Sequence, residues 1–342
     1  MSDIEYFDEA LSLFTALSSF HTDYLTLAGR KIHLNTPSPA LRELYLPPIA
    51  HLITEENMEK PGLTIWYAEG KDLFKRLSAP AGGLFNERGF RPSDDENDVQ
   101  IFHFPYQKQI FLYSRSKQTG IYWVSSITDI PWWDTTCSFR VIFHLWTRDL
   151  PAQLVHAGAV ANDSTGVLIT GVSGSGKSTS CLNLLRAGYK YLGDDFVWVE
   201  LGPRPVVHAL YQTAKVEIDN FHKNFIEWKP FLRNSETYYN EKALLHIKDM
   251  MPGQWLSASP VKTILLPKVS GTRQTSFDRA SSSKAFFEMA PSTLHFLPHN
   301  RDISYQKLLQ LSSALPAHSW QLGFDIEQFQ SSFTNFINNE LS

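Results

Sequence analysis

The sequence of 342 residues has little cysteine: Cys137 and Cys181 lie far apart and lack the spacing of metal ligands. Two free cysteines argue against a disulfide scaffold or a zinc site and are typical of a reducing compartment. Charge of one sign is not in excess either, because 31 Lys and Arg stand against 35 Asp and Glu. The formal net charge of -4 excludes a broad basic field for nucleic acid or an anionic membrane, so any anion site must be local.

Long hydrophobic runs are absent as well. No segment approaches the length of a membrane span, and the N-terminus, MSDIEYFDEALSLF, lacks the positive region and apolar run of a signal peptide. We therefore expect a cytoplasmic protein with neither a membrane nor a nucleic-acid partner. The apolar content of 43% is enough to bury a sizeable core in one large domain or in two.

Two parts of the chain differ in their patterns. Residues 1–150 combine helical spacing over 4–20 with strand-like segments at 63–68 and 109–114, which predicts an N-terminal α/β or α+β module. This module is a candidate for binding an acceptor or a partner. Residues 151–342 form the second predicted domain, in which short apolar strands are followed by helix-like stretches.

The segment GVSGSGKST at 171–179 fits the phosphate-binding pattern GxxxxGK[ST] without a mismatch. It follows the apolar strand VLITG and opens the helix-like stretch STSCLNLLRAG, which Gly188 is expected to end. Glycines let the backbone wrap a phosphate closely, and the helix N-terminus adds its dipole. Lys177 is expected to reach the β and γ phosphates, and Ser178 to help hold Mg²⁺. The residues predicted to bind the nucleotide here are Gly171, Ser173, Gly174, Ser175, Gly176, Lys177, Ser178 and Thr179.

Two adjacent carboxylates, Asp194 and Asp195, follow Lys177 at a distance that leaves room for one helix and one short strand. This spacing predicts that they lie at the carboxyl end of a strand beside the phosphate loop, where open α/β sheets bind ligands. One carboxylate can hold Mg²⁺ and the other can accept a proton from an attacking hydroxyl. The alternative is a plain polar turn, since Gly-Asp-Asp is good turn chemistry.

His156 lies in VHAGAV, upstream of the strand that leads into the phosphate loop. If VHAGAV and VLITG pair as a hairpin, His156 lies either near the nucleotide or one strand length away, and the sequence leaves this open. An isolated histidine is more often structural than functional.

In this order, HAGAV, GVSGSGKST and GYKYLGDD resemble the C-terminal catalytic domain of HPr kinase/phosphorylase and its HPr-kinase-like relatives. The resemblance covers roughly residues 150 to 340. It is closer to the relatives than to HPr kinase/phosphorylase itself, whose Glu-x-Arg-Gly signature is missing from this sequence. It implies an α/β fold with a P-loop-containing core like that of HPr kinase and phosphoenolpyruvate carboxykinase. Homo-oligomeric assembly is a further expectation, because HPr kinase/phosphorylase assembles as an oligomer.

The resemblance also implies roles for individual residues. With ATP and Mg²⁺ as cofactors, Asp194 would act as the base, Asp195 would join Ser178 at the metal, and His156 would be a polar group of the active site. Lys215 ends the stretch ALYQTAK, which resembles a Tyr-containing segment of the relatives, and is expected to contact the nucleotide. Arg273 lies in KVSGTRQT, a partial counterpart of the arginine-containing loop of HPr kinase/phosphorylase. It is therefore a candidate to clamp the transferring phosphate, although a lone loop arginine is usually solvated.

These features predict a Mg²⁺- and ATP-dependent kinase that transfers the γ-phosphate to a hydroxyl, namely a serine of a peptide or protein. Two alternatives stay open: a kinase for a small hydroxylated metabolite, since nothing fixes the size of the acceptor, and a nucleotide-dependent switch without catalysis. A GTPase is disfavoured because no [NT]KxD sequence follows the phosphate loop.

Overall fold

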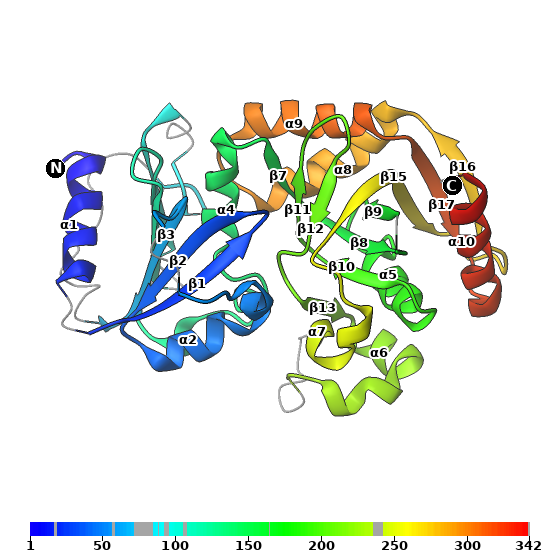
Figure 1. Cartoon of the computed structure of the whole chain (residues 1–342), viewed down its shortest axis with the longest axis horizontal. Helices are drawn as coiled ribbons and strands as arrows, with labels where there is room; N and C mark the ends of the chain where they lie inside the picture. The colour runs from blue at the N-terminus through cyan, green and yellow to red at the C-terminus, as the bar shows by residue number, and fades with distance from the viewer. Residues whose placement is uncertain are drawn as a thin grey trace. The chain divides into compact units, whose positions relative to one another are not determined.

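The computed structural model describes residues 1–16, 19–56, 59–71, 85–87, 89–91, 96–104, 108–163, 165–234 and 242–340. The chain forms two compact units, one made of Met1–Asp149 with Leu297–Arg301 and the other of Leu150–Phe296 with Asp302–Ser342 (Figure 1). Each unit combines helices with a sheet in which parallel and antiparallel strands are mixed. The predicted fold class is therefore confirmed at the level of a mixed α/β protein.

The first unit is built on a six-stranded sheet of order β1-β2-β3-β6-β5-β4. Its strands are β1 (His21–Leu27), β2 (Arg30–Thr36), β3 (Leu63–Glu69), β4 (Val99–Phe104), β5 (Gln109–Ser114) and β6 (Thr119–Val124). Its helices are α1 (Asp3–Thr15), α2 (Pro39–Tyr45), α4 (Arg140–Trp146) and the 3-10 turns η1 (Pro47–Leu52), η3 (Ile127–Asp129) and η4 (Thr147–Asp149). The expected helix near the N-terminus and the strands at 63–68 and 109–114 are thus all present.

Side chains alternate between the two faces of this first sheet. Trp123 of β6 packs against Phe14 of α1, whereas the preceding Tyr122 contacts Tyr45 of α2. Period-two alternation places successive side chains on opposite faces. Helices therefore cover both faces, with α1 on one and α2 on the other.

The second unit is built on a nine-stranded sheet that branches along its longest strand. The order β10-β8-β9-β15-β12-β11-β7 is extended by β17 and β16, which continue from β15. Its strands are β7 (Ala152–Val155), β8 (Ala157–Ala161), β9 (Gly166–Thr170), β10 (Lys190–Gly193), β11 (Val197–Glu200), β12 (Val206–His208), β15 (Ala258–Val269), β16 (Ser276–Ala280) and β17 (Ala317–Leu322). A separate two-stranded sheet pairs β13 (Thr213–Val216) with β14 (Ala243–His246).

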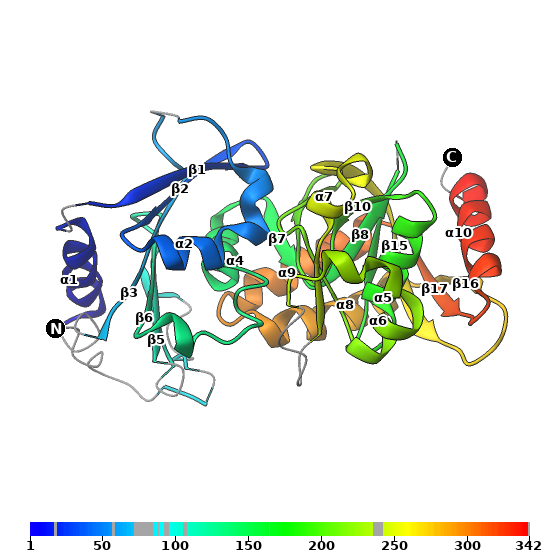
Figure 2. The same ribbon diagram turned by 90° about the horizontal axis from the view of Figure 1, so that it is seen from below.

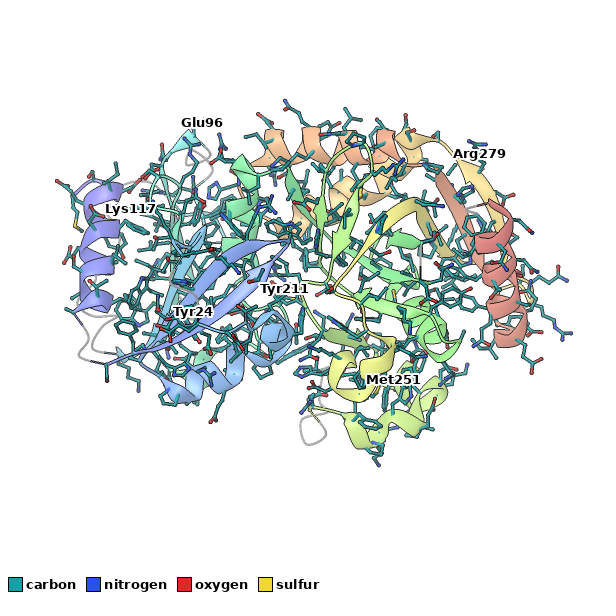
Figure 3. The ribbon with its side chains drawn as sticks, in the orientation of Figure 1. Tyr24, Glu96, Lys117, Tyr211, Met251 and Arg279 are labelled. Atoms are coloured by element: carbon teal, nitrogen blue, oxygen red, sulfur yellow. The ribbon has the colours of Figure 1, made fainter. Side chains whose placement is uncertain are left out.

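Helices cover both faces of the nine-stranded sheet. They are α5 (Lys177–Arg186), α8 (Ser282–Phe296), α9 (Arg301–Ala314) and α10 (Ile326–Glu340), with the shorter α6 (Ile218–Asn224), α7 (Ile247–Met250), η5 (Ile226–Phe231) and η6 (Pro252–Gln254) near β13 and β14. Val167 and Ile169 of β9 lie in one core cluster with residues of α5 and α10, and Leu168 lies in the other with residues of α8 and α9. Figure 2 shows β16 and β17 beside α10. Tyr211, labelled in Figure 3, is buried.

The helix α5 that follows the phosphate loop ends as its sequence predicts. Gly188 has a left-handed φ of 95°, and the N–H of the next residue, Tyr189, donates to Leu184 O at 3.0 Å. Glycine adopts this conformation without a Cβ penalty, which is why it ends helices so often. Among the helices of the described residues, none is long and apolar enough to cross a membrane.

Candidate active site

The phosphate-loop segment joins a buried strand to a helix. β9 ends at Thr170 and α5 begins at Lys177, so residues 171–176 make the turn between them. Gly176 stands at the N-cap of α5 with φ 106°, and a Cβ there would lie 2.5 Å from Leu322 Cδ1. The left-handed backbone favours glycine here, and a larger residue would also have to displace the Leu322 side chain. The spacing of the motif therefore fixes the turn that precedes the helix.

Lys177 closes the loop on itself. Its Nζ donates to Gly171 O at 2.8 Å and to Val172 O at 3.0 Å, and the side chain is buried. Burial lowers the pKa of this ammonium, while the carboxylates of Asp194 and Asp195 act in the opposite direction. A cation held at this point by two carbonyls is available to an anion that binds in the loop.

The hydroxyls of the motif have different surroundings. Ser178 hydrogen-bonds the side chain of Asp194, and Thr179 Oγ1 accepts a hydrogen bond from Asn220 Nδ2 of α6 at 2.7 Å. Ser175 Oγ is buried without a hydrogen-bond partner among the described residues, whereas Ser173 is exposed. Ser178 thus faces the acidic pair, and Thr179 faces α6.

Strand directions bring the acidic pair to the same sheet edge as the phosphate loop. β8 is antiparallel to both β9 and β10, so these two strands run the same way and end at one edge. The phosphate loop leaves β9 there, and Asp194 and Asp195 follow directly after β10, before β11.

Asp194 is the buried member of the pair, with a side chain 2% exposed. Lys215 N donates to Asp194 Oδ2 at 3.5 Å, a long contact, and Oδ1 has no hydrogen-bond partner among the described residues. Burial raises the pKa of Asp194, and the neighbouring charge of Asp195 raises it further. This carboxylate is therefore more basic than an ordinary aspartate.

Asp195 is the charged member of the pair. Its backbone has a left-handed φ of 69°, which is uncommon for a residue other than glycine and concentrates at functional sites. His156 Nε2 lies 3.2 Å from Oδ1, and Lys215 Nζ forms an ion pair with Oδ2. Burial alone would raise the pKa of Asp195, but the Lys215 ammonium and the hydrogen bond from His156 outweigh burial and hold the pKa well below its usual range. Asp195 therefore stays ionised.

His156 lies in the bend between β7 and β8, at the end of the β8–β9 hairpin that carries the phosphate loop. Ala157 pairs with Thr170, and Thr170 Oγ1 donates to His156 O at 3.2 Å. The backbone N–H of His156 donates to Thr293 Oγ1 of α8 at 3.1 Å, and the His156 ring packs against Phe296. Of the two positions that the sequence left open, the structure places His156 at the one beside the loop.

Arg273 is not brought into this group. It lies in the turn between β15 and β16, its side chain is 76% exposed, and its Nε donates to Asp325 Oδ2 at 3.0 Å. The described contacts of Arg273 run to the start of α10 and not to Lys177 or Asp194.

Three residues near the site carry no sequence motif. Asn220 holds Thr179, Thr293 holds the backbone of His156, and Glu288 Oε2 lies 3.8 Å from where a Cβ on Gly171 would stand. They come from α6 and α8, far along the chain from the residues they contact. Only the packing of these helices on the sheet identifies them.

The donor set fits a magnesium nucleotide. The described residues hold no group of three or more His, Cys, Asp or Glu side chains that could bind a metal unaided. Mg²⁺ keeps several waters and needs only one or two carboxylates together with phosphate oxygens. Ser175 Oγ and Asp194 Oδ1 are buried polar atoms that a ligand would satisfy. Lys177 and Lys215 supply positive charge beside them.

Comparison with curated proteins and with solved structures finds similar proteins in both. The chain is 36% identical over 86 residues to HPr kinase/phosphorylase of Bacillus velezensis, which covers 25% of this chain and 26% of that protein. The chain thus spans about a quarter of the length of this relative. This likeness confirms the resemblance to the HPr-kinase-like family that the motifs predicted.

The Hpr(Ser) kinase/phosphatase from Coxiella burnetii is similar in structure, with a TM-score of 0.33 and 10% identity, over 56% of this chain and 99% of that one. No family model matches the sequence.

Proposed function

We propose that this protein is a Mg²⁺- and ATP-dependent kinase that transfers the γ-phosphate to a hydroxyl, namely a serine of a peptide or protein. One observation carries the proposal: a phosphate-binding loop and two carboxylates whose pKa values are shifted in opposite directions share one sheet edge. When the pKa values of two carboxylates differ in this way, one can act as the base while the other stays ionised. On this view the second unit is an HPr-kinase-like nucleotide-binding core, and the first unit binds the acceptor or a partner.

Each residue then has a defined task. Loop N–H groups and Lys177 hold the phosphates of ATP, and Lys215 contributes a second cation beside them. Asp194 accepts the proton of the acceptor hydroxyl as its oxygen bonds to the γ-phosphorus and the bond to the β-phosphate oxygen breaks, releasing ADP. Asp195 and Ser178 would hold Mg²⁺, which neutralises phosphate charge when it is bound. His156 orients Asp195 through its hydrogen bond.

The assignment of base and metal ligand rests on the two pKa directions. A carboxylate with a raised pKa accepts a proton more readily, and one held ionised is the better ligand for a hard cation. One contact favours the exchanged roles, because Ser178, the expected metal ligand of the loop, hydrogen-bonds Asp194. Metal dependence separates the two arrangements. If Asp194 is the base, D195N raises the Mg²⁺ concentration needed for half-maximal transfer, and D194N lowers the rate at saturating Mg²⁺.

The proposed activity is tested with ATP labelled at the γ-phosphate, Mg²⁺, an array of serine-containing peptides and a panel of hydroxylated metabolites. We expect a labelled acceptor, and D194N should lower transfer about 10²–10⁴-fold, the usual contribution of a general base. Calorimetry on the same variant checks that ATP still binds. Tight ATP binding with no labelled acceptor in either panel would refute the kinase and favour a nucleotide-dependent switch. D194N transferring as fast as the wild type would instead refute Asp194 as the base.

A further inference from the structure

The small sheet of β13 and β14 has one face in the core and one face toward the acidic turn. Its core face belongs to the cluster that also holds residues of α5, and it is made of Ala214, Val216, Ala243 and Leu245. Side chains alternate along a strand, so Lys215 and Leu244, which stand opposite each other in the register, share the other face. Lys215 forms an ion pair with Asp195. The face opposite the core cluster therefore points toward the proposed transfer site.

A second lysine, Lys242, lies on the same face. It stands two residues before Leu244, so the two side chains point the same way. Its Nζ lies 3.0 Å from Oε1 of Glu217, the residue that directly follows β13. This ion pair extends the antiparallel register of the sheet by one residue pair. Diagonal neighbours on one face of a sheet lie about 7–8 Å apart, so Lys242 is a close neighbour of Lys215.

The charge of Lys242 acts on the lysine of the phosphate loop. Burial is the largest cause that lowers the pKa of Lys177, and the positive charge of Lys242 lowers it as well. Exposed charges interact appreciably only over short distances, so the two ammonium groups are near each other. After Glu217 the chain enters α6, where Asn220 Nδ2 donates to Thr179 Oγ1 of α5. Lys242 therefore lies on the side of the loop where α5 begins.

The backbone of Lys242 is fixed, but its side chain can change partners. Asn234 Nδ2 donates to Lys242 O at 2.8 Å, and Leu244 N donates to Asn234 Oδ1 at 3.0 Å. The side chains of Lys242 and Glu217 are 40% and 72% exposed, respectively. An ion pair between exposed groups contributes little to stability, so a polyphosphate can compete with Glu217 for this ammonium.

We propose that Lys242 is a nucleotide-binding residue whose ammonium contacts the α- and β-phosphates of ATP. The inference rests on the proposed nucleotide site and adds a third cation to Lys177 and Lys215. Backbone N–H groups of the loop cradle the α- and β-phosphates, whereas Lys177 reaches the β- and γ-phosphates. Because Lys242 lies where α5 begins, it holds phosphates that stay on the nucleotide after transfer. Its contribution to binding is therefore the same for ATP and ADP.

Calorimetry with ADP and with ATP, each with Mg²⁺ at low ionic strength, tests this contact on the full-length protein without an acceptor. K242A should weaken the binding of both nucleotides about tenfold, the lower end for a hydrogen bond to a charged group, because solvent screens this side chain. K242R keeps the cation and should bind within about twofold of the wild type. E217Q removes the competing carboxylate and should tighten the binding of both nucleotides about twofold.

K229A is the matched control, because Lys229 is an exposed lysine of η5 outside this sheet, and it should bind both nucleotides like the wild type. Thermal unfolding checks that each variant is folded. In the transfer assay K242A should raise the KM for ATP about tenfold and change kcat less than about twofold. Binding that is equal in the ground state and the transition state changes KM alone.

The outcomes separate this contact from the chemistry. Unchanged affinity for both nucleotides in folded K242A overturns the inference, and so does a loss that K242R does not restore. A loss for ATP alone overturns the assignment to the α- and β-phosphates, because it places Lys242 at the γ-phosphate. Nucleotide binding that depends on Lys242, without transfer to any acceptor, refutes the kinase and supports the contact. If the wild type binds neither nucleotide, both fail.

Discussion

The phosphate loop and the acidic turn end parallel strands at one sheet edge, yet they are held in different ways. The loop is held by contacts within the motif, since Lys177 donates to Gly171 O and Val172 O, and Ser175 N donates to Val172 O. The acidic turn is held by residues from other elements, because Asp195 pairs with His156 from before β8 and with Lys215 of β13. A short motif thus specifies the loop, and only the assembled sheet specifies the turn.

This difference separates holding a nucleotide from using it. Changes in the loop should remove binding and transfer together, because Lys177 is the cation at the centre of the loop. Changes around the acidic turn should lower transfer while most of the binding remains. K177A and D194N test this separation, and the later substitutions test the contacts that hold the loop and the acidic turn in place.

The largest combined loss of ATP binding and transfer is expected from K177A. Removing the ammonium takes away a charge-assisted donor to the phosphates, so transfer should fall about 10²–10³-fold. ATP affinity, measured by calorimetry in the presence of Mg²⁺, should fall with it. D194N provides the contrast, because it should lower transfer and keep ATP affinity. If K177A bound ATP as tightly as the wild type, the loop would not be the nucleotide site.

The next effect is expected from K215A, which removes the ion pair with Asp195. The pKa of Asp195 is held low by this ammonium and should rise toward its ordinary value. A depressed carboxylate pKa contributes stability that is present above the unfolded pKa and is lost as the pH falls through the folded value. Without Lys215 that contribution is reduced, so acid unfolding followed by circular dichroism should begin at a higher pH.

K215R is the matched control for this change, because it keeps a cation near Asp195. It should unfold in acid like the wild type. Identical acid transitions for K215A and the wild type would show that the ion pair does not set the charge of Asp195.

A smaller effect, on the free energy of unfolding, is expected where β8 packs against α5. β8 lies between β9 and β10, the strands that end at the phosphate loop and at the acidic turn. A Cβ on Gly158 would lie 2.4 Å from Cys181 Sγ, so G158A should lower the free energy of unfolding by about 1–3 kcal/mol. G202A is the control, since a Cβ on Gly202 meets nothing within 4 Å. Urea titration should show that C181A recovers part of the loss when it is combined with G158A. Strictly additive losses would mean that this contact is not the cause.

The smallest effect is expected from N220A. Asn220 Nδ2 donates to Thr179 Oγ1, and such a hydrogen bond contributes about 0.5–1.5 kcal/mol net to the free energy of unfolding. A double-mutant cycle with T179A isolates this contribution, because each single change removes the same bond. A coupling energy near zero would show that α6 is positioned without it.

Much of the fold around the phosphate loop could be predicted from the sequence, because its causes are local. The apolar run of β9, the glycines of the loop and the stop at Gly188 each act within a few residues. The strand that ends just before Asp194 could likewise be predicted, because the spacing from Lys177 leaves room for one helix and one short strand.

Features that depend on how strands and helices pair with one another could not be predicted. The sequence left two positions open for His156, and the register of Ala157 with Thr170 decides between them. No periodicity indicates that Asn220 reaches Thr179 or that Thr293 reaches His156. Arg273, considered as a phosphate clamp, pairs with Asp325 in the structure, and its role stays a prediction.

The pairing of β15 with β9 also bears on the order in which this unit folds. The strands β8, β9 and β10 and the helix α5 all lie between residues 157 and 193, so their pairing closes only short loops. β15 and β17 join β9 from much farther along the chain. Short loops close at a lower entropic cost, and contacts of low sequence separation form sooner. We therefore expect the phosphate loop to take shape before β15 and β17 join the sheet.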